Sequence, residues 1–309
     1  MPRLLITGAS GLLGANLVLA AHEDHEVIAV YHRHPIELEG VQSMSADLSE
    51  PGVAKELFNR FQPDCVVHGA AATDVDACED DPDTAFRLNS TMAGYVAAAA
   101  ADTQARLIHI STDAVFDGGA WHYSESDPTE PVNTYGRSKL EGEKIVTQAY
   151  PQSTIVRTNI YGWNAQPKFS LAEWFLDHLE RGMNTTGFSN VFFSPILVND
   201  LIDRLIQLLK INNSGIIHLA GADCISKYEF GRELAVIFQL DPELVEPVSS
   251  ENVEQKAPRA ERLCLRSENS ERVFDSHPVG VKEGLCRLKS LREEGYTNRL
   301  RSMVLSNGR

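Results

Sequence analysis

A tyrosine and a lysine stand four positions apart near the middle of the chain, within TYGRSKLEGEK (134–144). Residues with this spacing on a helix lie on the same face, so Tyr135 and Lys139 are expected to project side by side. An ammonium beside a phenol favours the phenolate and lowers its pKa from about 10 toward neutral pH, where the phenol can transfer a proton. The spacing by itself also fits a half-buried tyrosine beside a solvated lysine.

A second group of residues with chemical meaning lies in ITGASGLLG (6–14), between the first apolar run and the first helical segment. Glycines at this place permit a tight turn, a close approach of the backbone to a pyrophosphate and close packing of helix on strand. A plain strand-to-helix turn is the alternative. The motif predicts a dinucleotide site whose contacts are Gly8, Ser10, Gly11, Leu12, Leu13 and Gly14.

The end of the second apolar run indicates which dinucleotide binds. NAD-binding proteins usually carry an acid there, about 20 residues beyond the glycines, to hold the ribose hydroxyls. This chain reads VYHRH (30–34), which contains no acid, and Arg33, with His32 or His34, is suited to pair with a 2′-phosphate. We therefore expect NADP(H) to be preferred and NAD(H) to be possible, unless these basic side chains only face water.

Two further segments are candidates for contact with the cofactor. Asp47 and Leu48 follow the expected third strand and are placed to contact the adenine. Ala70, Ala71 and Ala72 end the expected fourth strand, where small side chains would let a cofactor lie flat against the backbone. Simple packing of these alanines in the core is the alternative.

Short apolar runs alternate with helical segments over the first 160 residues. The runs are 3–8, 26–31, 64–71, 106–112 and 153–162, and the helical segments include 11–22, 53–61, 84–102 and 135–148. Such alternation implies parallel strands joined by right-handed crossovers. The sequence thus predicts an α/β fold with a doubly wound parallel Rossmann sheet.

The rhythm changes after Gly162, where irregular stretches separate the remaining helices and strands. We expect a smaller, mixed C-terminal substrate lobe, with the tail from about Tyr296 frayed. The predicted domains are 1–163 with 196–222 for the NADP(H)-binding Rossmann domain and 164–195 with 223–309 for the substrate-binding lobe.

Composition excludes several classes of partner. With 28 basic and 43 acidic residues the net charge is −15, which argues against nucleic acid and against anionic membranes. Five widely spaced cysteines without a C-x-x-C predict neither a disulfide framework nor a metal site. The chain shows no apolar leader and no apolar segment of membrane length, so we expect a cytoplasmic protein.

Taken together, three segments resemble the extended short-chain dehydrogenase/reductase family: GASGLLG (8–14), STDAVFDG (111–118) and YGRSK (135–139). The stretch from STDAVFDG to YGRSKLEGEK is most similar to the dTDP-4-dehydrorhamnose reductase branch. Weaker similarity continues through RTNIYG (157–162), SPILVNDLID (194–203) and PRAERL (258–263), so the resemblance covers nearly the whole chain.

This resemblance implies roles for individual residues. Thr112, with Ser111 beside it, would hydrogen-bond a substrate carbonyl, and Tyr135 would protonate its oxygen as hydride arrives at carbon. Lys139 would hold the nicotinamide ribose and lower the pKa of Tyr135. Asn89 matches a position that helps to order the cofactor site, although an ordinary helix-surface asparagine fits equally well. The implied activity is NADPH-dependent reduction of a 4-keto nucleotide sugar.

The substrate contacts are less clearly indicated, because the chain departs from the family here. Ala114 replaces a tyrosine, and Asn159-Ile160 stand where relatives tend to carry a tryptophan. Tyr161 or Trp163 is expected to supply the missing aromatic surface for the sugar, or else to lie in the core. Our candidates for substrate contact are Thr73, Asp76, Phe116, Tyr161, Trp163 and, for the diphosphate, Arg259.

Two other functions stay open on the sequence. A nucleotide-sugar epimerase uses the same hydride chemistry, although the missing acid of the second run counts against a tightly held NAD. The chain also resembles the regulatory β subunit of methionine adenosyltransferase, in which NADP would be structural. A 4,6-dehydratase is disfavoured because no glutamate follows Asp113. The expected partners are a nucleotide-sugar substrate and, as a possibility, a second copy in a homodimer.

Overall fold

Seven strands, all paired in parallel, form the central sheet of the protein. The structure, a computed structural model, describes residues 1–304. In spatial order the strands are β11 (Gly215–His218), β6 (Thr154–Arg157), β5 (Arg106–Ile110), β4 (Cys65–His68), β1 (Arg3–Thr7), β2 (Glu26–Tyr31) and β3 (Gln42–Ser45). The predicted doubly wound α/β fold is confirmed.

The strand order reverses next to β1. β1 pairs with β2 on one side and with β4 on the other, so the chain winds outward in both directions from this point. The carboxyl ends of the strands beside such a switch point leave a crevice in which ligands bind in open α/β sheets. The topology therefore places a binding site beyond Thr7 and His68.

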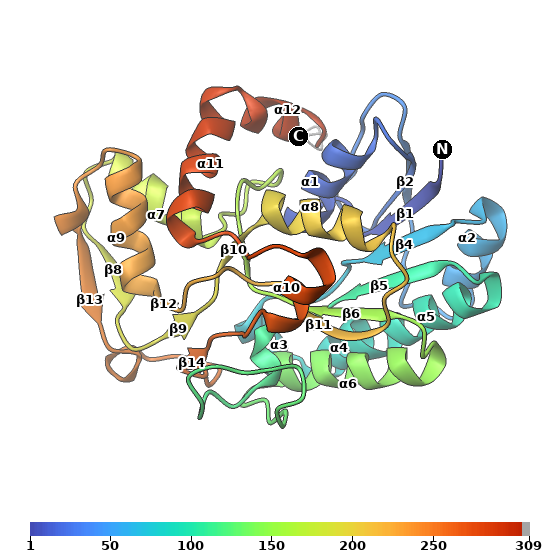
Figure 1. Cartoon of the computed structure of the whole chain (residues 1–309), viewed down its shortest axis with the longest axis horizontal. Helices are drawn as coiled ribbons and strands as arrows, with labels where there is room; N and C mark the ends of the chain where they lie inside the picture. The colour runs from blue at the N-terminus through green and yellow to red at the C-terminus, as the bar shows by residue number, and fades with distance from the viewer. Residues whose placement is uncertain (305–309) are drawn as a thin grey trace.

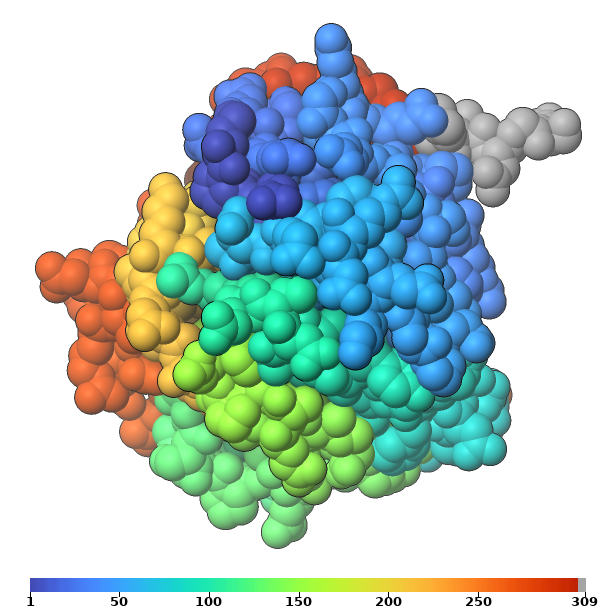
Figure 2. Space-filling model, turned by 90° about the vertical axis from the view of Figure 1, so that its right-hand side faces the viewer, coloured from blue at the N-terminus to red at the C-terminus, as the bar shows by residue number. Residues whose placement is uncertain are grey.

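Helices cover both faces of the sheet (Figure 1). α1 (Leu12–Ala21) packs against α8 (Val198–Leu208) on one face, and α2 (Val53–Phe61), α5 (Met92–Thr103) and α6 (Thr134–Ala149) lie together on the other. Figure 2 shows the side of the molecule where this N-terminal part, coloured blue to green, makes up most of the surface. Because both faces are covered, inner strands such as β2 and β4 are mostly apolar, whereas the edge strand β3 is polar.

A smaller set of elements forms the lobe at the left of Figure 1. Its elements are α7 (Leu171–Glu180), β8 (Thr185–Phe188), β9 (Phe192–Phe193), β12 (Ile225–Ser226), α9 (Lys227–Ile237), β13 (Val245–Val248) and β14 (Arg262–Leu263). β9 pairs with β12 and β14, and β8 pairs with β13. Segment 196–222 returns to the sheet through α8 and β11, and the exact domain boundaries stay a prediction.

The C-terminal segment is ordered against the Rossmann sheet, which corrects the expectation of fraying from Tyr296. α12 (Tyr296–Ser302) packs on α1. The Tyr296 hydroxyl donates to Asn16 Oδ1 at 2.6 Å and accepts from Asn199 Nδ2 at 3.1 Å, and Leu300 is buried. The sequence around Tyr296 and Leu300 is polar and charged, so it did not indicate this packing. Residues 305–309 lie outside the described part.

One disulfide joins Cys224 and Cys264, so the prediction of a chain without disulfides is wrong for this pair. Their Cα atoms lie 5.4 Å apart although 40 positions separate them in sequence. Cys224 directly precedes β12 and Cys264 directly follows β14, and these two strands flank β9. The topology brings the thiols together, which their spacing in the sequence could not reveal.

Two absences hold for residues 1–304. No helix in this range is both long and apolar enough to cross a membrane. The same range contains no group of three or more His, Cys, Asp or Glu side chains arranged to hold a metal ion.

Candidate active site

A cavity of about 840 Å³ opens at the carboxyl ends of the central strands and extends to the lobe. One end is lined by the glycine turn and the tips of β2 and β3, and the middle by the residues after β5 and by the start of α6. The other end is lined by β9, β14 and the first residue of α9. The cavity therefore joins the switch point of the sheet to the lobe.

The glycine turn has the shape that a pyrophosphate requires. Gly8 has φ of +67°, and a Cβ atom there would lie 2.8 Å from the backbone nitrogen of Ala70. A Cβ atom on Gly14 would collide with the carbonyl oxygen of Gly8. With Ser10, Gly11, Leu12 and Leu13 these residues line the cavity. The turn thus keeps backbone amides open at the N-terminus of α1, which fits the phosphates of a dinucleotide.

The tips of β2 and β3 present an arginine and a carboxylate to the same end of the cavity, and the π-helical turn Arg87–Thr91 adds a second arginine. Arg33 lines it beside His32 and Asp47, whose side chains approach to 3.7 Å. Asp47 accepts a hydrogen bond from the hydroxyl of Ser49 at 2.6 Å, which is the main reason that its pKa is lowered. Arg87, which sequence reasoning missed, also lines the cavity and donates to Ser49. This concentration of positive charge fits a 2′-phosphate.

Leu48 does not belong to this end of the cavity, which corrects our expectation. Its side chain is 4% exposed and packs in the core on the face of the sheet covered by α2 and α5. Asp47 and Leu48 are neighbours in an irregular segment after β3, and successive side chains point in different directions. Only Asp47 of this pair faces the cavity.

The loop after β4 is held in place by Asn89. Ala70, Ala71 and Thr73 line the cavity, but Ala72 does not. The Ala72 amide donates to Asn89 Oδ1 at 2.8 Å, and Asn89 Nδ2 donates to the Ala72 carbonyl at 3.0 Å. Asn89 is buried in a π-helical turn, a distortion that is frequent at functional sites. Asn89 and Ala72 therefore shape the loop instead of facing a cofactor.

Thr112, Tyr135 and Lys139 converge on the middle of the cavity, as the sequence predicts. Thr112 caps the turn that follows β5, with its hydroxyl accepting from Ala114 N and donating to Asp113 Oδ1, both at 3.1 Å. Tyr135 is the second residue of α6, and Lys139 follows one turn later. These elements bring a hydroxyl, a phenol and an ammonium to one surface.

Burial controls the ionisation of this group. It raises the pKa of Tyr135 to about 12, although a hydrogen bond with Thr112 acts in the opposite direction. It lowers the pKa of Lys139 to about 8, against the favourable charge of Glu143. The expected lowering of the tyrosine pKa by Lys139 is therefore wrong here, because desolvation dominates. At neutral pH Tyr135 therefore keeps its proton, which a strongly basic oxygen such as a developing alkoxide can take up.

Behind the catalytic candidates lies a buried ion pair that sequence reasoning missed. Arg157 donates to Glu143 through Nε at 3.0 Å and Nη2 at 2.7 Å, and the hydroxyl of Ser111 donates to the same carboxylate at 2.5 Å. The Lys139 ammonium donates to the carbonyl of Ile110 at 2.7 Å. Ser111 thus connects the end of β5 to α6, and its hydroxyl is directed at Glu143.

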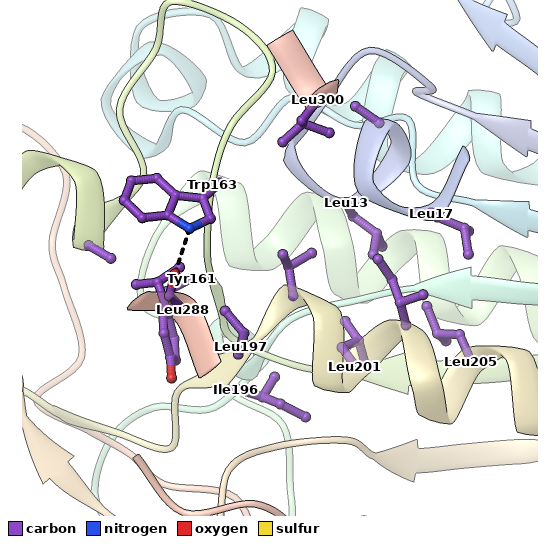
Figure 3. Packing of buried hydrophobic residues seen from close by; sticks show 14 of the residues in the cluster. Leu13, Leu17, Tyr161, Trp163, Ile196, Leu197, Leu201, Leu205, Leu288 and Leu300 are labelled. Atoms are coloured by element: carbon purple, nitrogen blue, oxygen red, sulfur yellow. Dashed lines mark hydrogen bonds between the residues drawn. The ribbon is translucent and has the colours of Figure 1, made fainter. Parts of the chain in front are cut away.

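The three aromatic residues proposed for substrate contact all lie in the core. Phe116, Tyr161 and Trp163 are at most 4% exposed, and none of them lines the cavity. Trp163 Nε1 donates to the carbonyl of Leu288 at 2.9 Å. Leu288 belongs to α11 (Val281–Glu293), and Tyr161 packs beside this helix (Figure 3). Phe116 stacks on Tyr123 with ring centroids 4.1 Å apart. These positions correct the expectation that they hold a sugar ring.

The lobe end of the cavity is lined mostly by residues that sequence reasoning did not select. Arg259 lines it as expected, but Asp76 does not, and its carboxylate receives two hydrogen bonds from Arg259 at 3.1 Å each. The additional lining residues from the lobe are Val191, Phe192, Phe193, Lys227, Ala260 and Leu263. Asp113 and Asn159 face them from the sheet side, with Asn159 Nδ2 donating to Asp113 Oδ2 at 2.6 Å.

Comparison with known proteins identifies the family. Residues 2–291 match the family described as RmlD substrate binding domain. The dTDP-4-dehydrorhamnose reductase of Mycobacterium tuberculosis is 34% identical over 274 residues, which cover 86% of this chain and 85% of that protein. The probable low-salt glycan biosynthesis reductase Agl14 of Haloferax volcanii is 31% identical over 290 residues, covering 92% and 96%.

Solved structures agree with this result. The crystal structure of dTDP-4-dehydrorhamnose reductase from Bacillus anthracis in complex with NADP has a TM-score of 0.81 and 26% identity, and the match covers 94% of this chain and 99% of that one. A hypothetical dTDP-4-dehydrorhamnose reductase from Sulfolobus tokodaii gives a TM-score of 0.81 at 31% identity, covering 91% and 98%. With the site geometry and these matches, the chain belongs to the RmlD substrate-binding-domain family.

Proposed function

We propose that this protein reduces the 4-keto group of a nucleotide-linked 6-deoxy sugar with NADPH. The observation that carries the proposal is the single cavity that joins the glycine turn, the group of Thr112, Tyr135 and Lys139, and the lobe. The dTDP-4-dehydrorhamnose reductases among its relatives support the choice of substrate class.

The residues of the chain fit NADP(H) at two points. The Gly8 turn and the N-terminus of α1 would hold the pyrophosphate, and Arg33 with Arg87 would hold the 2′-phosphate. Lys139 would hold the nicotinamide ribose. When bound, the cofactor supplies the hydride for the carbonyl carbon.

The chain's own residues would manage the oxygen of the carbonyl. Negative charge develops on this oxygen during reduction, so donors aimed at it stabilise the transition state selectively. Tyr135, protonated because burial raises its pKa to about 12, would donate the proton, and the hydroxyl of Thr112 would orient the oxygen. Glu143, on α6, would keep this helix in place against the sheet through its contacts with Ser111, after β5, and with Arg157, at the end of β6.

The test is NADPH consumption with a panel of 4-keto sugar nucleotides, with NADH measured alongside. We expect turnover with a dTDP-linked 4-keto-6-deoxyhexose, and faster turnover with NADPH than with NADH. Absence of consumption with every member of the panel, together with stoichiometric co-purification with another enzyme, would instead support a regulatory subunit.

The homodimer and the cytoplasmic location stay predictions. Sedimentation of the purified protein tests the first, and fractionation of cells tests the second.

A further inference from the structure

The lobe end of the cavity contains a lysine without a protein partner. Lys227 lines the cavity and is the first residue of α9. Within residues 1–304 its Nζ atom forms no hydrogen bond and no ion pair, and the ammonium lies 5.9 Å from the ring centroid of Phe188. The three N–H donors of this half-buried ammonium therefore have no acceptor within the described part of the protein.

This position is electrostatically costly for a lysine. The N-terminus of a helix carries partial positive charge, which disfavours a cation. Burial lowers the pKa of Lys227, and the nearby Arg259 lowers it further. Glu229 does not compensate, because its carboxylate accepts hydrogen bonds from the amide and hydroxyl of Ser226 in the helix cap. An ammonium in such an unfavourable electrostatic position indicates that Lys227 has a function, because local rules of stability are broken mainly at functional sites.

The surroundings of Lys227 point toward the reacting end of the substrate. The charge that favours the Lys227 ammonium is that of Asp113, which directly follows Thr112 and accepts a hydrogen bond from its hydroxyl at 3.1 Å. Arg259, the other cation of this end, is already paired with Asp76. Lys227 thus shares its part of the cavity with Asp113, which follows Thr112, and with Arg259. Because Arg259 is paired with Asp76, it is the candidate for the diphosphate, and Lys227 is the cation left to contact the sugar.

We propose that Lys227 donates a hydrogen bond to the hydroxyl group on C3 of the substrate sugar and selects sugars that carry it. This inference rests on the proposed function. In a 4-keto-6-deoxyhexose the carbonyl carbon has two ring neighbours, and only C3 bears a hydroxyl, since C5 bears the methyl group. A site with a buried donor for a hydroxyl rejects the analogue that lacks it, because the donor is then left unpaired.

The test measures binding by calorimetry in the presence of NADP⁺. The ligands are a dTDP-6-deoxyhexose with the reduced 4-hydroxyl, its 3-deoxy analogue, and dTDP alone. We expect Lys227→Met to weaken binding of the first by about 10- to 100-fold, which corresponds to loss of one charged hydrogen bond. The affinities for the 3-deoxy analogue and for dTDP should change by less than about twofold, since neither contains the C3 hydroxyl.

Two controls separate recognition from folding. Lys210→Met, at an exposed position outside the cavity, should change no affinity. Lys227→Met should bind NADP⁺ as the wild type does and melt at the same or a higher temperature, because the costly cation is gone. Lys227→Gln, which keeps a neutral donor, should fall between the wild type and the methionine variant.

Each other outcome overturns the inference. Equal weakening of all three ligands would assign Lys227 to the diphosphate, and unchanged binding of all three would assign it no role in recognition. If the wild type binds neither nucleotide sugar while still binding NADP⁺, the proposed function itself fails and the inference fails with it.

Discussion

The two ends of the cavity differ in how the chain builds them. The nucleotide end comes mainly from one continuous unit, β1, the glycine turn, α1, β2 and the three residues after β2, which occupies residues 3–34. The lobe end is assembled from residues after β6, from β9 and β14, and from the start of α9. Local sequence therefore specifies the first end, whereas the second depends on long-range packing.

The difference has a chemical counterpart. The nucleotide end uses backbone amides and glycines, whose spacing is fixed by the turn they form. The lobe end uses side chains such as Lys227 and Asn159 that face the cavity only because distant segments meet. If the proposed function holds, the side chains of the lobe end would be the ones that select the substrate.

The largest expected effect is that of removing the proton donor between the two ends. Tyr135→Phe should lower kcat by about 10²- to 10⁴-fold, the range of general acid catalysis. Single-turnover kinetics would measure the loss, and fluorescence titration should show an NADPH affinity close to that of the wild type. Tyr95→Phe, on α5 outside the cavity, is the matched control. Unchanged turnover in the Tyr135 variant would remove this phenol from the mechanism.

The next effect tests the nucleotide end alone. Arg33→Ala should weaken NADPH binding about 10- to 100-fold and leave NADH binding nearly unchanged, because only NADPH carries the 2′-phosphate. Arg60→Ala is the control, since Arg60 stacks on Phe61 and does not line the cavity. Equal losses for the two cofactors would show that Arg33 does not read the 2′-phosphate.

Sequence reasoning succeeded for residues whose role follows from local geometry. Gly8, Tyr135 and Lys139 face the cavity because a turn and a single helix place them there. It failed for Tyr161 and Trp163, since an aromatic side chain fits a core as well as a sugar site. The disulfide, the Glu143–Arg157 pair and Lys227 escaped because each depends on contacts between distant segments.

A smaller effect is expected from pH. Lys139, with its pKa lowered to about 8, is charged below that pH and loses its charge above it. Its hold on the cofactor ribose should therefore weaken as pH rises through about 8, so that KM for NADPH increases a few-fold. Tyr135 does not explain a change at this pH, because its pKa is about 12. In Lys139→Met the dependence should disappear, and a profile that persists in this variant would point to another group.

The smallest effect on catalysis is expected from Trp163, whose position in the core separates it from the lobe end. Trp163→Phe removes the donor to the Leu288 carbonyl and leaves part of the indole volume empty. The free energy of unfolding should fall by about 1–3 kcal/mol, which urea titration would measure. KM for the nucleotide sugar should stay the same, because the indole does not line the cavity. An increase in KM without loss of stability would return Trp163 to the substrate site and show that the lobe end extends further than the cavity indicates.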